Sequence, residues 1–329
     1  MNIVKAKRKL NRYFKRSKKV FIMAHKDLDL DALGSSIGLY HILEKRKKKC
    51  YLVIDDNTHE LGVSKVLREL EGCLEIIKGD KVANELHYRN NKNLLIILDT
   101  NKTDLVQNNT ILSLFQKTVI IDHHEQGTNS IENGLQIIDT EASSTCEMIT
   151  KLLELYDIQL DPYFSTLLLA GIVLDTNNFM LKTDEQTYYS AYYLSRLGAS
   201  TKKVQYLLKQ DIKDYTERHN LFSNIEIIDK HIAFTKSTPY TTYRREDLAK
   251  IADTLLFFND IEASFVIGKL SKTEVGISGR SLGNYNIGKI LEHLGGGGNN
   301  YNGAAKLEDV QISKVETELK KILKKEGVK

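Results

Sequence analysis

The stretch VFIMAHKDLDLDALGSSI, residues 20–37, contains the change from strand to helix that decides the fold. Its first six residues form a short apolar run typical of a buried strand, and residues 32–49 have the apolar spacing of a helix that ends in cations. Between them stand three acids on alternate positions, Asp27, Asp29 and Asp31. Like charges this close repel, so the segment is either a solvated loop or a place where positive charge sits among the carboxylates.

Three further β-branched runs, CYLVID, LLIILD and TVIIDHH, each contain an aspartate at or near their end and alternate with helical segments. This alternation predicts an α/β fold, in which a mostly parallel sheet has helices on both faces. A smaller α/β domain follows, with a hairpin at Ser271-Lys272 and a glycine-rich loop in GGGGNNYNGAA. We expect a catalytic domain at 1–208, a helical linker at 209–230 and a substrate-binding domain at 231–329. The functional crevice of such a sheet lies beyond the carboxyl ends of its strands.

The composition is that of a globular protein, with 41% hydrophobic and 27% charged residues in 329. Three widely spaced cysteines argue against a disulfide framework and favour a reducing cytoplasm, and no apolar run is long enough to span a membrane. The net charge of +4 is small for a protein that binds long nucleic acid. No acid precedes Asp27, whereas Lys and Arg crowd the first nineteen positions. A solvated basic helix is the favoured interpretation, and an arm that attracts phosphate or a membrane surface is the alternative.

The acidic sites at the segment ends point to metal chemistry if the fold brings them together. Four carboxylates would then share one partly buried crevice: Asp29, Asp31, Asp99 and Asp175. Isolated buried carboxylates are very costly, and two divalent cations would balance four of them. Two imidazoles, His25 and His123, make Mn²⁺, Fe²⁺, Co²⁺ or Zn²⁺ better candidates than Ca²⁺. A pair of such ions is the usual device of phosphoryl chemistry, in which a bridging water becomes hydroxide.

The residues DHH at 122–124, with HKDLDLDALGS upstream and GGGGNNYNGAA downstream, resemble the DHH/DHHA1 phosphoesterase family from about residue 18 to residue 305. The segments VFIMAHK, DLDALGS, EASSTCEM, LLLAGIVLDT and SGRSLGNYN are similar to its cyclic di-AMP phosphodiesterase branch. This resemblance implies a hydrolase that converts cyclic di-AMP to 5′-pApA by a two-metal hydroxide mechanism, with Mn²⁺ as the favoured ion. The alternative in the same family is a nanoRNase and pAp phosphatase that degrades pApA and short oligoribonucleotides to mononucleotides. A module that binds nucleotides without cleaving them is a third hypothesis.

The resemblance also implies roles for individual residues. One ion falls to His25, Asp29 and Asp99, and the other to Asp31, Asp99, His123 and Asp175. Asp122 would orient a ligand histidine, and His124 would act on the phosphate as a hydrogen-bond donor or proton shuttle. The expected substrate-binding residues are Arg280, Ser281, Gly295, Gly296, Gly297, Gly298 and Asn299. Asn299 stands where the family usually has histidine, which puts the substrate fit in question. The expected partner is a small nucleotide, and the oligomeric state stays open, with a homodimer as one candidate.

Overall fold

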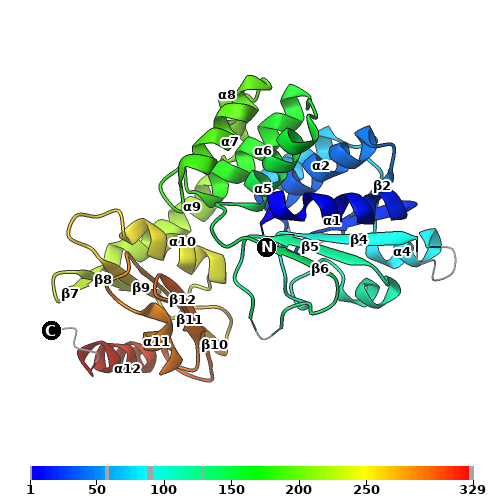
Figure 1. Cartoon of the computed structure of the whole chain (residues 1–329). Helices are drawn as coiled ribbons and strands as arrows, with labels where there is room; N and C mark the ends of the chain where they lie inside the picture. The colour runs from blue at the N-terminus through cyan, green and yellow to red at the C-terminus, as the bar shows by residue number, and fades with distance from the viewer. Residues whose placement is uncertain (1, 56–58, 87–91, 128, 326–329) are drawn as a thin grey trace. The chain divides into compact units, whose positions relative to one another are not determined.

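The computed structural model describes residues 2–55, 59–86, 92–127 and 129–325 (Figure 1). The chain divides into two compact units, Met1–Lys209 and Gln210–Lys329. Residues 209–230, expected as a separate linker, contain the helix α9 (Ile212–His219) and the 3₁₀ helix η2 (Asn220–Asn224), which belong to the second unit. The division of function between the units stays a prediction.

The first unit is built on a six-stranded sheet in which all neighbouring strands are parallel, in the order β3-β2-β1-β4-β5-β6. Its strands are β1 (Lys19–Met23), β2 (Lys49–Val53), β3 (Ile76–Ile77), β4 (Asn93–Leu98), β5 (Thr118–Asp122) and β6 (Leu135–Ile138). The predicted α/β class is confirmed. The chain order reverses at β1, which lies between β2 and β4, and ligands of open α/β sheets bind beyond the strand ends at such a point.

Helices cover both faces of this sheet, and alternate strand residues face the two layers. Val20 and Ile22 pack in one core with α1, α2, α5 and α6, whereas Phe21 and Met23 pack in another with α4 and η1. The helices of the unit are α1 (Ile3–Arg16), α2 (Leu30–Lys45), α3 (Leu61–Glu69), α4 (Gly79–Glu85), η1 (Asn109–Leu114), α5 (Thr145–Tyr156), α6 (Pro162–Asp175), α7 (Glu185–Arg196) and α8 (Thr201–Leu207). Burial on both faces explains why the strands are continuous apolar runs rather than alternating ones.

Close packing of α2 on α6 requires glycine at the contact. A Cβ at Gly34 would stand 2.8 Å from the Leu167 carbonyl oxygen, and one at Gly171 would stand 2.5 Å from Cys146 Sγ and 2.8 Å from Asp31 Cα. The missing side chains let the first turn of α2 approach the middle of α6. This contact sets the position of the acid that ends α6.

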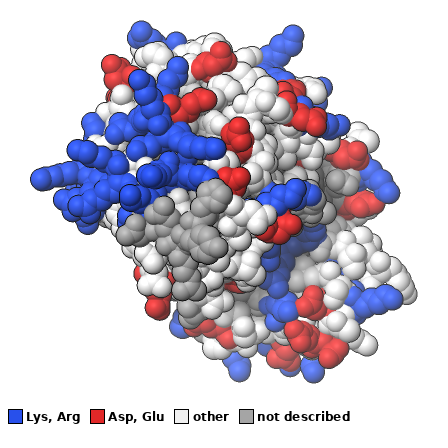
Figure 2. All heavy atoms as spheres, turned by 90° about the vertical axis from the view of Figure 1, so that its right-hand side faces the viewer, with Lys and Arg blue, Asp and Glu red and all other residues white. Residues whose placement is uncertain are grey.

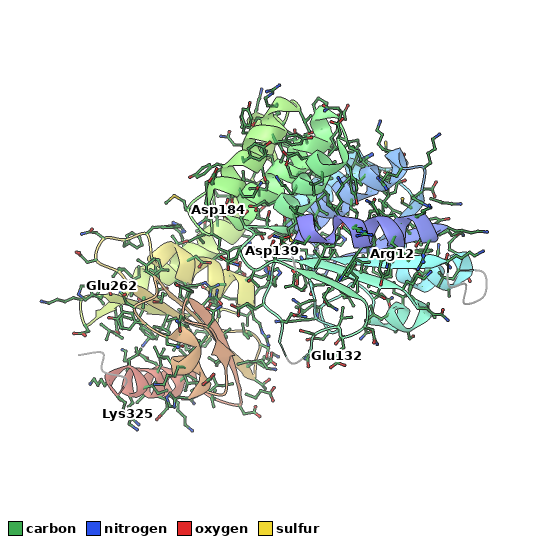
Figure 3. The ribbon with its side chains drawn as sticks, viewed as in Figure 1. Arg12, Glu132, Asp139, Asp184, Glu262 and Lys325 are labelled. Carbon is green, nitrogen blue, oxygen red and sulfur yellow. The ribbon has the colours of Figure 1, made fainter. Side chains whose placement is uncertain are left out.

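The first helix is amphipathic and leads directly into β1. Its inner side buries Ile3, Leu10 and Phe14, and the Asn2 side chain caps its start by accepting from the Lys5 amide at 3.1 Å. Figure 2 shows Lys and Arg side chains gathered on one side of the molecule, and Figure 3 labels Arg12 on this helix. The predicted basic helix before the first strand is confirmed.

The second unit contains a mixed six-stranded sheet in the order β11-β12-β10-β9-β8-β7. Its strands are β7 (Glu226–Ile228), β8 (Ile232–Lys236), β9 (Ala263–Lys269), β10 (Glu274–Ser281), β11 (Gly297–Gly298) and β12 (Asn302–Glu308), and its further helices are α10 (Arg245–Leu255), α11 (Ile287–Glu292) and α12 (Ile312–Lys325). β8 and β9 are parallel, and the other pairs are antiparallel. The predicted hairpin at Ser271-Lys272 is confirmed by the pairing of β9 with β10.

The glycine-rich segment, expected as a loop, contains a short strand. Gly297 and Gly298 form β11, which pairs with β12. A Cβ at Gly296 would stand 2.3 Å from the Ala304 carbonyl oxygen, and one at Gly298 would stand 2.2 Å from that of Asn302. These glycines therefore allow two backbone segments to approach each other, an explanation that a composition argument cannot separate from flexibility.

Two expectations from composition concern cysteine and membrane-spanning helices. Cys50, Cys73 and Cys146 all carry free thiols. Within the described ranges, none of the helices combines the length and the apolar character that a membrane crossing requires.

Candidate metal centre

The opening acidic segment is divided between a loop and the start of a helix. Asp29 is the N-cap of α2, and its Oδ1 accepts a hydrogen bond from the Ala32 amide at 2.8 Å. Asp31 lies in the first turn of the same helix and is fully buried, whereas Asp27 is exposed to solvent. Carboxylates are favoured at this end of a helix because the unpaired amides there carry partial positive charge. The helix start therefore explains two of the three acids.

The remaining predicted ligands come from other segment ends. Asp99 follows β4 in the left-handed backbone region, with φ of 59°. His123 follows β5 and is buried, and Asp175 is the last residue of α6. His25, which follows β1, is held through its carbonyl oxygen by Gln107 Nε2 at 2.8 Å. Each predicted ligand residue thus either follows a strand of the sheet or lies at an end of a helix.

Three overlapping groups bring these ligand atoms within 4.8 Å of one another. The groups are His25 with Asp29 and Asp99, Asp31 with His123 and Asp175, and Asp99 with His123 and His124. His25 Nε2 lies 3.4 Å from Asp99 Oδ2, and His123 Nε2 lies 3.1 Å from Asp175 Oδ2 and 3.5 Å from Asp99 Oδ1. Asp99 therefore stands between two sets of donors, each of which could hold a metal ion.

The electrostatics of the cluster fit divalent cations. Burial, together with the nearby Asp99 and Asp175 carboxylates, raises the pKa of Asp31 well above its usual range. Burial and the charges of Asp29 and Asp99 likewise raise the pKa of Asp175. Such carboxylates need a positive partner to remain ionised, and divalent cations supply it.

His123 has the properties of a metal ligand. Burial lowers its pKa, so the ring is favoured in the neutral form in which imidazole binds metals. Neither ring nitrogen makes a hydrogen bond with any residue of the described ranges, although both are buried. A mixed set of carboxylate and imidazole donors is typical of first-row transition ions.

Asp122 and His124 form a unit at the edge of the cluster. His124 Nδ1 lies 2.8 Å from Asp122 Oδ1, whose other oxygen accepts from Asn101 Nδ2 at 2.7 Å. Burial opposes the charged imidazole, but the hydrogen bond to Asp122 and the negative charges of Asp99, Asp122 and Asp175 together outweigh it and raise the pKa of His124 to about 9. The His124 side chain is 55% exposed, so the rest of its ring is accessible to a ligand. The Asp122 carboxylate thus contacts the ring of His124, and its role in orienting a ligand histidine stays a prediction.

The residues predicted to bind substrate in the second unit make contacts within that unit. Arg280 Nε lies 2.6 Å from Asp253 Oδ1, and its Nη1 donates to the Gly279 carbonyl oxygen at 2.9 Å. Ser281 Oγ accepts from the Gly283 amide at 2.9 Å, and Asn299 Oδ1 accepts from the Tyr301 and Asn302 amides at 2.9 and 3.0 Å. Gly295 and Gly297 would have no atom near an added Cβ. Binding of a nucleotide by these residues stays a prediction.

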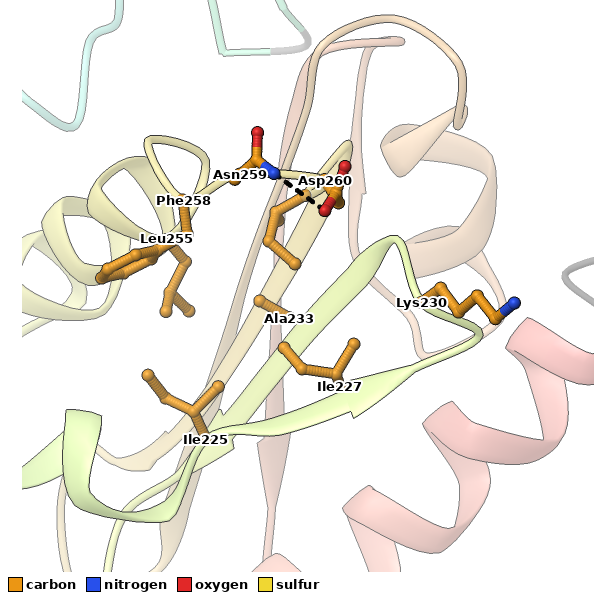
Figure 4. Close-up of a pocket in the computed structure, with 9 residues that line it drawn as sticks. Ile225, Ile227, Lys230, Ala233, Leu255, Phe258, Asn259 and Asp260 are labelled. Atoms are coloured by element: carbon orange, nitrogen blue, oxygen red, sulfur yellow. Dashed lines mark hydrogen bonds between the residues drawn. The ribbon is translucent and has the colours of Figure 1, made fainter.

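A hollow of about 420 Å³ in the second unit has a different character (Figure 4). Aliphatic and aromatic side chains dominate its lining, among them Ile225, Ile227 and Phe258. Its polar contacts include a hydrogen bond from Asn259 Nδ2 to Asp260 Oδ2 at 2.9 Å. It contains none of the residues that the sequence selected as functional.

Sequence reasoning missed four residues that contact or position the candidate ligands. Thr145 Oγ1 donates to Asp99 Oδ1 at 2.9 Å, and the amides of Thr145 and Cys146 both donate to Asp31 at 2.8 Å. Asn101 Nδ2 donates a hydrogen bond to Asp122, and Gly171, which has no side chain, lets α2 pack closely against α6. A signal for Thr145 was available in the helix start ASSTCEM, because a helix N-terminus attracts anions.

Comparison with known proteins identifies the class of this chain. Residues 19–172 match the model of the DHH family, N-terminal domain, and residues 234–326 match that of the DHHA1 domain. The chain therefore belongs to the DHH/DHHA1 phosphoesterase family.

The chain also aligns with individual proteins of known name. The chain is 37% identical over 311 residues to the cyclic-di-AMP phosphodiesterase GdpP of Geobacillus thermodenitrificans, an alignment that covers 93% of this chain and 47% of the relative. It is 36% identical over 308 residues to the cyclic-di-AMP phosphodiesterase PdeA of Listeria monocytogenes, an alignment that covers 92% of this chain and 47% of PdeA. The chain thus spans about half the length of these relatives. It is also 24% identical to the bifunctional oligoribonuclease and PAP phosphatase NrnA of Mycoplasma genitalium, and this alignment covers 93% of this chain and 94% of NrnA.

Among solved structures, an exopolyphosphatase-related protein of Bacteroides fragilis matches the fold with a TM-score of 0.78. Its sequence identity is 19%, and the match covers 97% of this chain and 95% of that one. At this identity the comparison supports the arrangement of the fold alone.

Proposed function

We propose that the chain is a metal-dependent phosphodiesterase that hydrolyses cyclic di-AMP to 5′-pApA. The observation that carries the proposal is the set of three overlapping donor groups that meet where the strand order reverses. The choice of substrate is supported by the names of relatives that align with more than nine tenths of the chain. The free cysteines are consistent with action in a reducing cytoplasm.

Two divalent ions, with Mn²⁺ favoured, are the proposed cofactors. His25, Asp29 and Asp99 would hold one ion, and Asp31, Asp99, His123 and Asp175 the other. Such a pair activates water and draws negative charge from the phosphate when bound. Asp99 would be the shared ligand, so its position would affect both ions.

The chain's own residues hold and move protons around this pair. Asp122 keeps His124 Nδ1 engaged, which leaves Nε2 as the nitrogen that faces the substrate. His124 would donate from Nε2 to the phosphate or to the departing 3′-oxygen. Arg280 would meet a phosphate through its remaining guanidinium edge, with Asp253 fixing its orientation. The glycines 295–298 with Ser281 and Asn299 would contact the nucleotide.

The alternative is a nanoRNase and pAp phosphatase. It is supported by the name of NrnA, a relative whose sequence aligns with this chain over 94% of its length. The experiment that tests the proposal incubates the chain with cyclic di-AMP, pApA or pAp and Mn²⁺, and separates the products by chromatography. We expect cyclic di-AMP to give pApA, and we expect a chelator to stop the reaction. Turnover of pApA or pAp alone would refute the proposed substrate and favour the alternative.

A further inference from the structure

The positive charge of this chain is concentrated in two short segments. Residues 1–19 and 45–49 contain 14 of the 47 Lys and Arg residues and no acid. The other residues carry 33 Lys and Arg against 43 Asp and Glu, a net charge of −10. The excess of positive charge is therefore local, and the proposed hydrolytic site does not use it.

The two segments form one surface. Arg46 Nη2 donates to Asn11 Oδ1 at 2.7 Å, and Lys48 Nζ donates to the Ser17 carbonyl oxygen at 3.1 Å. Lys19 and Lys49 are register partners at the starts of the neighbouring strands β1 and β2. We call the exposed Lys and Arg side chains of residues 5–18 and 45–49 the basic face, and it contributes to the cluster of cations in Figure 2.

Acids do not neutralise the basic face. Among the basic residues of the two segments, Lys19 is the one that pairs with an acid within the described ranges, at 2.8 Å from Glu85 Oε2. The apolar side of α1 is already used, because Ile3, Ala6, Leu10 and Phe14 are buried in the core. A partner of the outer side of α1 would therefore be bound mainly through the charges of its Lys and Arg side chains.

The location of this surface separates it from the metal centre. Lys19 and Lys49 begin β1 and β2, whereas the candidate ligands follow the carboxyl ends of parallel strands. The basic face therefore lies toward the amino end of the sheet and does not line the candidate site. A partner bound there would leave the metal centre accessible.

We propose that the basic face docks this unit on the anionic phospholipid headgroups of a bilayer. Ten of its segments' fourteen cations are Lys, whose mobile charges suit a diffuse anionic surface better than directed contacts to single phosphates. Single-stranded nucleic acid is recognised by aromatic stacking, and none of the described residues from 2 to 49 is an exposed aromatic. These two observations favour lipid over single-stranded nucleic acid.

The experiment measures partition of the whole chain onto phosphatidylcholine vesicles with and without phosphatidylglycerol. The test variant neutralises four exposed cations of α1: Arg8→Gln, Lys9→Gln, Arg12→Gln and Lys15→Gln. Each Lys or Arg near such a surface contributes about fivefold in partition, so we expect a loss on the order of several hundredfold. Binding of the unaltered chain should also fall steeply between about 0.1 M and 1 M salt.

Two companion variants make the result specific. The matched control removes the same charge from exposed positions of α12: Lys314→Gln, Lys321→Gln, Lys324→Gln and Lys325→Gln. It should change vesicle binding by less than about twofold. An independent variant, Lys45→Gln with Lys47→Gln and Lys49→Gln, should lose on the order of 100-fold, which removes dependence on the folding of α1.

The proposal fails if the unaltered chain binds neutral and anionic vesicles equally, or if the α12 control loses as much binding as the α1 variant. A parallel titration with a labelled single-stranded RNA tests the other polyanion. RNA binding that both basic-face variants abolish, without preference for anionic vesicles, would assign the face to nucleic acid and overturn the proposal. Hydrolysis by the variants reports their folding, because none of the substituted residues lies in the metal centre.

Discussion

Replacement of Thr145 by valine removes one hydrogen bond from the carboxylate that stands between the two donor sets. Thr145 is fully buried, and its hydroxyl donates to Asp99 Oδ1 at 2.9 Å. A hydrogen bond to a charged group contributes about 1.5–3 kcal/mol, and residues that orient metal ligands commonly affect metal affinity by 10- to 100-fold. We therefore expect Thr145→Val to weaken Mn²⁺ binding by roughly 10- to 100-fold in calorimetric titration.

The same helix offers a matched control. Thr150 is also buried in α5, but its hydroxyl donates to the Cys146 carbonyl oxygen at 2.7 Å and does not reach the cluster. Thr150→Val should keep the Mn²⁺ affinity of the unaltered chain, and Thr145→Ser should restore most of it because the hydroxyl is retained. Unchanged affinity in Thr145→Val, or an equal loss in Thr150→Val, would refute the assignment of Thr145 as a positioning residue.

Three further perturbations follow from the same contacts. Gly171→Ala places a Cβ 2.8 Å from Asp31 Cα, so it should lower the free energy of unfolding by about 1–3 kcal/mol in denaturant titration and weaken Mn²⁺ binding; unchanged values would contradict the packing argument. Arg280→Gln should raise KM for cyclic di-AMP by about tenfold or more with a smaller effect on kcat, whereas an unchanged KM would remove this residue from the phosphate site. In chelator, the metal-free chain should lose stability as the pH rises above about 4, because Asp31 and Asp175 have raised pKa values in the folded state and bind protons that the unfolded chain has released. The thermal shift caused by Mn²⁺ should then be larger at neutral than at acidic pH, and a shift independent of pH would count against these two ligands.

Much of the first unit could be predicted from the chain because local signals agreed with the fold. Apolar runs that end at or near an acid indicate β1, β4 and β5, and the nearly uniform apolar sequence of residues 162–175 is typical of a buried helix such as α6. Ser144 and Glu147 have the three-residue spacing of a capping box, which indicates the start of a helix, and in α5 Ser144 Oγ accepts from the Glu147 amide at 3.0 Å. In a full capping box the Glu147 carboxylate would accept from the Ser144 amide, but here it accepts from the hydroxyls of Ser143 and Thr187. That choice depends on α7, which is remote in sequence.

Other features depend on contacts that no local pattern contains. The order of the strands, which places β4 beside β1, arises from the pairing of segments about 70 residues apart. The four consecutive glycines are identical in sequence but differ in their surroundings. A side chain at Gly296 or Gly298 would meet the backbone of β12, whereas one at Gly297 would meet open space. The contacts of Thr145 with two different acids likewise require the tertiary fold. The candidate ligands were predicted because each is an aspartate or a histidine at or near a segment end, a signal that can be read without knowledge of the packing.

The central claim is that acids from separate segments converge to hold a pair of divalent ions. Crystals soaked in Mn²⁺ and measured at the manganese absorption edge would locate bound ions by anomalous scattering. The account predicts two peaks roughly 3.5–4 Å apart, one beside His25 and Asp29 and the other beside Asp31 and Asp175, with Asp99 between them. A single peak, or peaks remote from Asp99, would contradict it.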